Sequence, residues 1–161
     1  MKLTEKELQY FNDCLKEFLT SDQVLKMQDY TQHGNTSCLQ HCLFVAYYSY
    51  LVSRRFHLTK DYRSLIRGAL LHDFFLYDWH EKSDRKGLHG FTHPKVALEN
   101  AQKHFVLNTI EKDIILKHMW PLTLRLPRYK EAYLVSFIDK YCSLAETFKA
   151  PLPLPENIIF T

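Results

Sequence analysis

Apolar residues recur every three to four positions along most of the chain, which is the spacing of one face of an α-helix. The pattern predicts helices over about residues 4–20, 37–56, 61–75, 92–105, 109–118 and 129–148, with a short helical turn over 22–27. Capping residues support these starts: Thr4 with Glu7, one of the residues 35–37, and Thr92 ahead of Pro94. No segment alternates convincingly as a strand does. The chain is therefore predicted to be all-α, a bundle of six to seven helices.

The length of 161 residues suits a single domain with one buried core. Residues 78–90 are polar and contain two glycines, so we expect a loop there. The stretch 150–161 is rich in proline and is expected to form an extended tail packed on the surface. The predicted domain therefore consists of an N-terminal helix, a helical core and a C-terminal tail.

Charge and composition exclude several classes of partner. The net charge of +3 is too small to indicate a nucleic acid polymer or a membrane surface. The N-terminus does not resemble a signal peptide, and no run approaches the roughly 18 apolar residues of a membrane helix. The four cysteines form no CxxC pair, which fits a reducing compartment. We therefore expect a cytoplasmic protein, either monomeric or homodimeric.

The most informative stretch is an apolar and aromatic run that contains His72 and Asp73. A buried carboxylate requires a cation or a full set of hydrogen bonds. Imidazole and carboxylate are both ligands of first-row metals. His41 and Asp139 also interrupt apolar helical stretches, so neighbouring helices can direct all four groups at one cavity. The sequence thus predicts a metal site of two histidines and two aspartates.

Two further histidines lie between His72-Asp73 and Asp139. His93 and His118 fall near predicted helix ends and can add a second ion, with Asp73 as the bridge. A purely structural role at the helix ends remains the alternative for both. Cys38 and Cys42 flank His41, but without further ligands at zinc spacing they are interpreted as buried thiols.

The order H…HD…D at His41, His72, Asp73 and Asp139 resembles the HD superfamily of metal-dependent phosphohydrolases. The resemblance extends over about residues 32–148, and residues 68–71 look like that family's run before its His-Asp motif.

The second pair of histidines also fits this resemblance. Some members of the family hold two metal ions and use two further histidines to bind the second ion. His93, which a proline follows, and His118 resemble those histidines.

The resemblance implies hydrolysis of a small phosphate ester, such as a nucleotide or related metabolite, by water that the metal ions activate. His72 and Asp73 are then at the centre of catalysis. Iron or manganese is favoured, and zinc, nickel, cobalt or magnesium is possible. Candidate contacts to the substrate are His33, Lys82, Arg85, Lys86, Arg125 and Arg128, with His89 as a further candidate.

One departure from the family pattern matters. Phosphodiesterases of the two-metal subset often carry a small residue, Gly and Lys after His-Asp, and that Lys contacts phosphate. Phe74, Phe75 and Leu76 occupy these positions here. The phosphate contact must then come from elsewhere, which counts against the cyclic-dinucleotide activity of those relatives.

Two other functions stay open. Some HD-type proteins with two irons resemble oxygenases, which use the same six ligands to activate dioxygen. A non-catalytic module that binds a ligand without converting it is the second alternative, although the intact set of ligands argues against it. The ligand types alone do not separate hydrolysis from oxygen chemistry.

Overall fold

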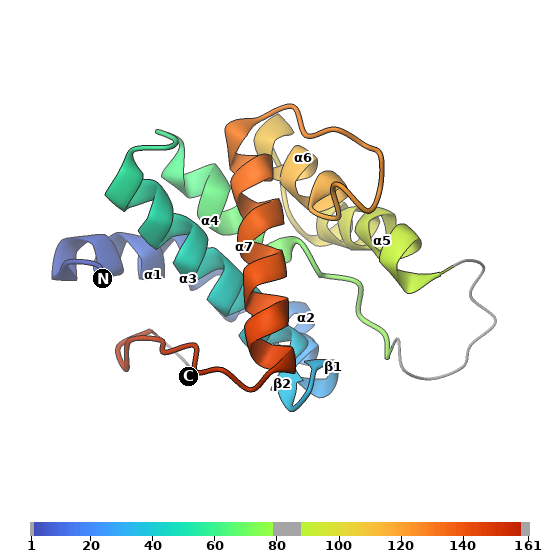
Figure 1. Ribbon diagram of the computed structural model, residues 1–161, viewed down its shortest axis with the longest axis horizontal. Helices are drawn as coiled ribbons and strands as arrows, with labels where there is room; N and C mark the ends of the chain where they lie inside the picture. Colours follow the sequence, from blue (N-terminus) through green and yellow to red (C-terminus); the bar gives the residue numbers. More distant parts are fainter. Residues whose placement is uncertain (1, 79–87, 159–161) are drawn as a thin grey trace.

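The computed structural model describes residues 2–78 and 88–158, apart from the side chains of His33 and His89. Helices dominate this part of the chain (Figure 1), which confirms the predicted all-α class. The helices are α1 (Glu5–Leu19), α2 (Asp22–Leu25), the 3-10 helix η1 (Lys26–Asp29), α3 (Cys38–Phe56), α4 (Tyr62–Leu71), α5 (His89–His104), α6 (Thr109–Lys117) and α7 (Lys130–Thr147). None of these described helices is long and apolar enough to cross a membrane.

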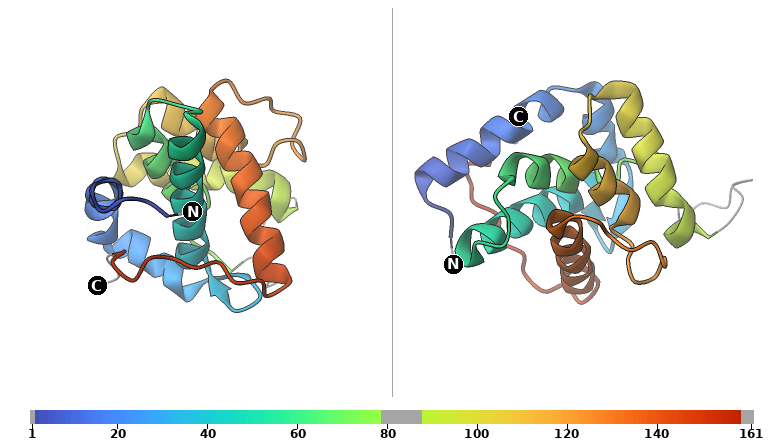
Figure 2. Two further views of the ribbon diagram at one scale, coloured as in Figure 1. Left: turned by 60° about the vertical axis from the view of Figure 1, so that its left-hand side comes forward. Right: turned by 90° about the horizontal axis from the view of Figure 1, so that it is seen from above.

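Helix α3 lies at the centre of the fold and contacts both α4 and α7 (Figures 1 and 2). It begins at the predicted cap, because the Ser37 hydroxyl accepts a hydrogen bond from the Gln40 amide at 3.2 Å. The spacing of its apolar residues predicted one buried face, but residues on other faces, such as His41 and Val45, are also buried. Helices pack on α3 from more than one side, so one of its faces alone does not define the core.

Helix α1 covers the edge of this core. Its predicted capping box is confirmed: the Glu7 amide donates to the Thr4 hydroxyl, and the Thr4 amide donates to the Glu7 carboxylate. Phe11, Leu15 and Phe18 are fully buried, as helical spacing predicted, and α1 packs against α4. Burial of this stripe fixes α1 to the bundle.

The prediction that the chain contains no strand was wrong at one place. Strands β1 (Thr31–His33) and β2 (Thr36–Ser37) form a small antiparallel hairpin. Gly34 lies in its turn with φ of 59°, a conformation that glycine adopts without strain. Strands of three and two residues are too short to show alternation in the sequence. The hairpin matters because it places Gln32 beside the candidate site.

Helix α4 is shorter than predicted, since it ends at Leu71 rather than near residue 75. His72 closes the helix, and Asp73 lies in the turn that follows. Beyond it, the carbonyls of Phe74 and Phe75 accept hydrogen bonds from the Asn100 side chain at 3.2 and 3.1 Å. This external donor satisfies the carbonyls outside a helix, so the chain turns away at the position of the His-Asp pair.

The start of α5 also differs from the prediction. Thr92 does not cap the helix, because α5 begins at His89 after Leu88. The Thr92 hydroxyl instead donates to the Leu88 carbonyl at 3.2 Å, and Pro94 lies inside the helix. The extra turn places His93 within α5 rather than at its first residue. Helix α6 begins as predicted at Thr109, with Asn108 as its cap.

The C-terminal stretch is extended and packs on the surface, as predicted. The Tyr48 hydroxyl donates to the Pro153 carbonyl at 3.0 Å, and the Asn12 side chain donates to the Asn157 carbonyl at 3.0 Å. Ile158 is buried in the same hydrophobic core that α1, α3, α4 and α7 share. The tail therefore crosses the side of the bundle near the start of α1 (Figure 1).

Candidate metal centre

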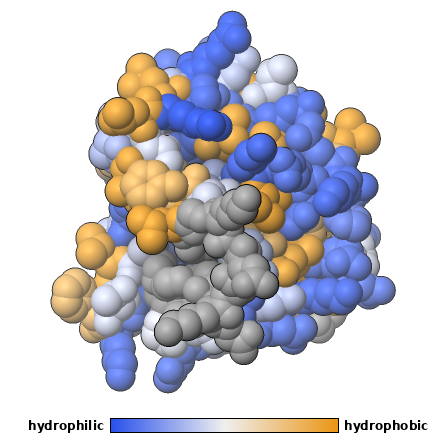
Figure 3. Space-filling model, turned by 90° about the vertical axis from the view of Figure 1, so that its right-hand side faces the viewer, coloured by the Kyte–Doolittle hydropathy of each residue, from blue (hydrophilic) through white to orange (hydrophobic). Residues whose placement is uncertain are grey.

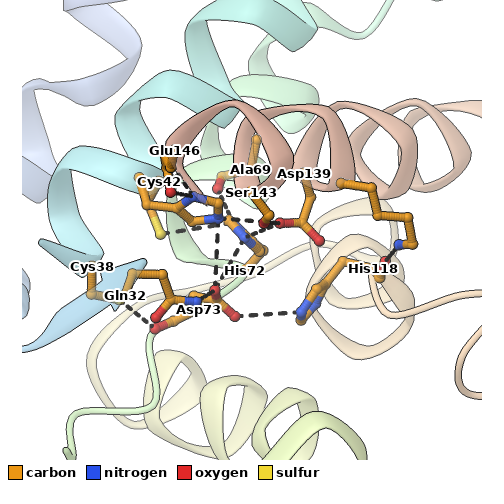
Figure 4. Close-up of polar contacts among 12 residues, drawn as sticks. Gln32, Cys38, Cys42, Ala69, His72, Asp73, His118, Asp139, Ser143 and Glu146 are labelled. Atoms are coloured by element: carbon orange, nitrogen blue, oxygen red, sulfur yellow. Dashed lines mark hydrogen bonds and ion pairs between the residues drawn. The ribbon is translucent and has the colours of Figure 1, made fainter. Parts of the chain in front are cut away.

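The six predicted ligands come together from five helices, and Figure 4 labels four of them, His72, Asp73, His118 and Asp139. The six are His41 on α3, His72 and Asp73 at the end of α4, His93 on α5, His118 at the end of α6, and Asp139 on α7. All six side chains are buried. The convergence of ionisable groups from five separate places in the fold is the main feature of this structure.

The Asp73 carboxylate lies between two groups of histidines. Its Oδ2 atom is 3.4 Å from His72 Nε2 and 3.9 Å from His41 Nε2. Its Oδ1 atom is 3.1 Å from His93 Nε2 and 3.4 Å from His118 Nε2. Each carboxylate oxygen thus faces one pair of imidazoles. A carboxylate arranged in this way can bridge two cations.

Asp139 completes the first group. Its Oδ1 atom is 3.1 Å from His41 Nε2 and 3.7 Å from His72 Nε2. The possible ligand atoms of these three residues lie within 4.8 Å of one another. The same holds for His72, Asp73 and His118. Two imidazoles and carboxylate oxygens at this spacing match the ligands of a first-row metal ion.

Neighbouring carbonyl groups fix the orientation of two imidazole rings. His72 Nδ1 is 2.7 Å from the Ala69 carbonyl oxygen, and His118 Nδ1 is 2.9 Å from the Ile115 carbonyl oxygen. A carbonyl only accepts hydrogen bonds, so in each ring Nδ1 carries the proton and donates it. In a neutral ring Nε2 then presents a lone pair to the site. This arrangement is usual for metal-binding histidines.

His41 is held by a carboxylate instead. Its Nδ1 atom lies 3.0 and 3.1 Å from the two carboxylate oxygens of Glu146, whose side chain is almost completely buried. Its Nε2 atom faces Asp139. Glu146 therefore lies behind His41 as a carboxylate partner of a candidate metal ligand. Such a partner raises the basicity of the imidazole.

The chemistry of the buried atoms fits a metal ion. Among the described residues, His72 Nε2 and Asp73 Oδ1 are buried without a hydrogen-bond partner. With Nδ1 as the donor to Ala69, a neutral His72 directs a lone pair at the oxygens of Asp73 and Asp139. Acceptors that face one another in a buried site require a positive charge between them. A metal ion at this point meets that requirement.

The pKa shifts of the buried groups also indicate that the site needs positive charge beside its carboxylates. Burial alone lowers the pKa of His41, but hydrogen bonds to Asp139 and Glu146 outweigh it and raise this pKa well above its usual value. Burial raises the pKa of Asp73, but the charges of His72 and His93 hold it well below its usual range. The site thus favours anionic carboxylates and cationic partners. Protons and metal ions compete for this role, which makes metal binding dependent on pH.

The second pair of histidines differs from the first. His93 Nε2 and His118 Nε2 are 2.8 Å apart, and both face Asp73 Oδ1. Burial lowers the pKa of His118 despite the Asp73 carboxylate beside it, so the neutral ring is favoured. The neutral imidazole is the form that binds metal. This pair can therefore accept a cation without first losing a proton from His118.

A pocket of about 430 Å³ opens onto the site. Its lining includes Gln32, Asp73, Gly90, His93, His118, Met119, Leu122, Asp139, Lys140 and Ser143. Lys140 is the cationic residue in this lining. Its ammonium group donates to the His118 carbonyl at 3.0 Å and to the Ser136 carbonyl at 3.0 Å. The positive charge is thus held at a fixed place next to Asp139.

Two of the predicted substrate contacts, Arg125 and Arg128, lie away from the pocket. Arg125 is exposed and lines another hollow, beside Phe91 and Thr92. The Arg128 guanidinium lies over the Tyr129 ring, 5.7 Å from its centre, and its backbone amide donates to Asp113. The structure therefore does not bring either arginine to the pocket, because the loop before α7 directs them elsewhere.

The remaining predicted contacts stay untested. Lys82, Arg85 and Lys86 lie outside the described residues, and the side chains of His33 and His89 are not described. Their roles remain predictions from the sequence.

Two residues of the site were missed by the sequence analysis. Gln32 Nε2 donates to Asp73 Oδ2 at 2.5 Å, while its buried Oε1 has no hydrogen-bond partner among the described residues. Glu146 supports His41. A signal for Glu146 existed, because it lies seven residues after Asp139 on the same face of an apolar helix. No comparable signal marked Gln32, which lies in a short polar stretch.

The two cysteines beside His41 remain protonated thiols. Cys38 Sγ donates to the Asp73 carbonyl at 3.2 Å, and Cys42 Sγ lies 3.7 Å from His72 Nδ1. Burial raises the pKa of both thiols. This agrees with the interpretation of both residues as buried thiols that pack against the site.

Comparison of the chain with family models, with curated proteins and with solved structures gave no match.

Proposed function

We propose that this chain is a metal-dependent phosphohydrolase of the HD type, which holds two metal ions and hydrolyses a phosphate ester of a small molecule. The observation that carries this proposal is the position of Asp73, whose two oxygens each face a separate pair of histidines. When bound, ions at such a site lower the pKa of a coordinated water and offset the negative charge of a phosphoryl group.

The residues of the chain have distinct roles in this proposal. His41, His72 and Asp139 would hold one ion, His93 and His118 would hold the other, and Asp73 would contribute to both. The carbonyls of Ala69 and Ile115 keep the rings of His72 and His118 in the binding orientation. Burial of the whole set excludes competing water and strengthens these electrostatic interactions.

The pocket supports a small substrate. A volume of about 430 Å³ is in the range of sites for small molecules and too small for a folded polymer. Met119 and Leu122 give one part of its lining an apolar character, and Lys140 gives another part a positive charge. We assign the phosphate end of the substrate to the side of Lys140 and its organic part to the side of Met119 and Leu122.

Lys140 is our candidate for the phosphate contact that the family pattern places after His-Asp. Phe74 and Phe75, which follow His72-Asp73, are buried in the core and offer no group to a phosphate. Lys140, by contrast, lines the pocket, and its ammonium group donates to the His118 carbonyl, the Ser136 carbonyl and the Ser136 hydroxyl. In this proposal it replaces the phosphate-binding lysine found after His-Asp in some two-metal relatives.

The test combines metal content with turnover. The full chain is purified without a metal-binding tag, loaded with Mn²⁺ or with Fe²⁺, and assayed on a set of nucleoside monophosphates and a generic aryl phosphate. We expect about two ions per chain and metal-dependent release of phosphate. Asp73→Ala should lose both ions and the activity, whereas His118→Ala should lose only one ion.

His104→Ala is the matched control, because His104 is an exposed histidine on α5 outside the site. It should keep both ions and full activity. Full metal content in Asp73→Ala would refute the site. Two ions without phosphate release, but with consumption of oxygen in the presence of iron, would replace the hydrolase with an oxygenase. Ligand binding without any turnover would leave a non-catalytic module.

A further inference from the structure

Helix α7 carries an apolar stripe on the face that points away from the metal centre. Phe137, Tyr141, Leu144 and Phe148 are 57%, 56%, 59% and 77% exposed, although all four are large and hydrophobic. With the half-buried Leu134 they recur at alternating intervals of three and four residues. These five residues, Leu134, Phe137, Tyr141, Leu144 and Phe148, are called the α7 stripe below. Such spacing is typical of a helix that pairs with another helix.

The α7 stripe carries no charge. The three charged residues within its span, Asp139, Lys140 and Glu146, contact the metal centre or line its pocket. An uncharged stripe lacks the complementarity that an acidic or basic partner requires, and it lacks the flanking rows of basic residues typical of membrane-surface helices. The partner that fits it is therefore an uncharged apolar helix of similar length.

A second copy of α7 meets this description. Tyr141 is the midpoint of the stripe, with Leu134 seven residues before it and Phe148 seven residues after it. In an antiparallel pair about a two-fold axis, Tyr141 faces its own copy, Leu134 faces Phe148, and Phe137 lies within one residue of the position that faces Leu144. Every position of the stripe then meets an apolar residue, as an isologous interface requires.

The position of α7 allows this pairing. Helix α7 lies at the outer margin of the molecule in both views of Figure 2, so another helix can reach it. Trp120, on the loop before α7, contacts Tyr133 and Phe137, with ring centres 5.4 and 5.8 Å away. In the view of Figure 3, hydrophobic side chains lie along the left edge of the molecule, among hydrophilic ones.

The exposed area is sufficient for a dimer. Four large side chains at these exposures present roughly 400–500 Å² in each copy, given the 150–250 Å² that an aromatic side chain can bury. Two copies then cover roughly 1,000 Å², which is the lower limit for a specific interface. Leu134 and the loop around Trp120 add to this area. We propose that the chain forms a two-fold dimer through antiparallel pairing of the α7 stripe.

Sedimentation velocity of the full chain tests this proposal. Measurements from about 1 to 100 μM should show a monomer–dimer equilibrium, because interfaces of this size often bind in the micromolar range. Leu144→Lys places a charge in the stripe and should raise the dissociation constant at least tenfold. Val106→Lys is the matched control, since Val106 is 93% exposed but lies between α5 and α6. It should not change the equilibrium.

A disulfide cross-link tests the geometry separately. Tyr141→Cys should form a covalent dimer on mild oxidation, while Val106→Cys should remain monomeric. The four native cysteines are buried and do not compete. A monomer at all concentrations, or a dimer that Leu144→Lys leaves intact, would overturn the proposal. Association of the wild-type monomer with lipid vesicles, lost in Leu144→Lys, would overturn it as well. Metal content and activity of the proposed hydrolase are measured independently of these outcomes.

Discussion

Replacement of Glu146 gives the sharpest test of the metal centre. Both of its carboxylate oxygens lie within 3.1 Å of His41 Nδ1; His41 is fully buried and the Glu146 side chain is almost completely buried. In Glu146→Gln the amide oxygen can still accept the hydrogen bond from His41, but the negative charge is lost. Glu146→Leu removes both the charge and the acceptor. The two variants therefore separate orientation of the ring from its electrostatic support.

The expected magnitude follows from this geometry. Loss of a carboxylate behind a histidine ligand weakens metal binding about 10- to 100-fold, which corresponds to about 1.4–2.7 kcal/mol. Glu146→Gln keeps the acceptor, so we expect an effect near tenfold. Glu146→Leu loses both the hydrogen-bond acceptor and the negative charge. Because these interactions are strongest in a buried environment, we expect metal binding to weaken nearly 100-fold. Only the ion held by His41, His72 and Asp139 should be affected.

Isothermal titration of the metal-free chain with Mn²⁺, repeated in competition with a chelator, measures the two binding events. The weaker affinity should appear in one event, while the event that depends on His93 and His118 stays unchanged. Glu99→Gln serves as control, because Glu99 is an exposed carboxylate on α5 that pairs with Lys95 at 3.7 Å. Unchanged affinity in Glu146→Leu, or equal weakening of both events, would refute the assigned role of Glu146.

Three further predictions concern the scaffold. Arg67→Ala leaves the buried Glu111, now 2.5 Å from Arg67 Nε, without its cation and should lower the free energy of unfolding by about 3–5 kcal/mol in urea titrations. Gly68→Ala places a Cβ atom 2.6 Å from Ile114 Cδ1 and should cost about 1–3 kcal/mol by the same assay. Burial raises the pKa of Tyr50 to about 12, above the value of about 10 in the unfolded chain, so stability present below pH 10 should be lost as the pH rises toward 12. Tyr50→Phe should reduce this loss, as unfolding at alkaline pH would show.

Controls for these variants come from exposed neighbours. Arg63→Ala removes a solvent-exposed ion pair with Glu17 and should change stability by less than about 1 kcal/mol. In Gly90→Ala the added Cβ meets the ends of two flexible side chains, Leu122 at 3.3 Å and Met119 at 3.7 Å, and the change should be tolerated. Stability losses in these controls as large as in Arg67→Ala and Gly68→Ala would show that burial is not the cause.

The sequence by itself determined the helices and the set of candidate ligands. Helix periodicity and caps such as Thr4–Glu7 are local, so they can be identified without the fold. His41, His72, Asp73 and Asp139 stood out because an ionisable group in an apolar run is costly unless it has a partner. The all-α class followed from these local signals, and the resemblance to a known family extended the predicted ligand set to His93 and His118.

Only the tertiary structure decided how the ligands are arranged. Gln32 and Asp73 are 41 residues apart, and His41 and Glu146 are 105 residues apart, so neither contact has a local signature. The end of α4 at Leu71 depends on Asn100, a residue of another helix. Helix α7 is apolar on two faces, and packing alone determines that Asp139 points inward while Tyr141 stays exposed. Long-range contacts of this kind form only when the helices pack, which is why sequence patterns identified the ligands but not their partners.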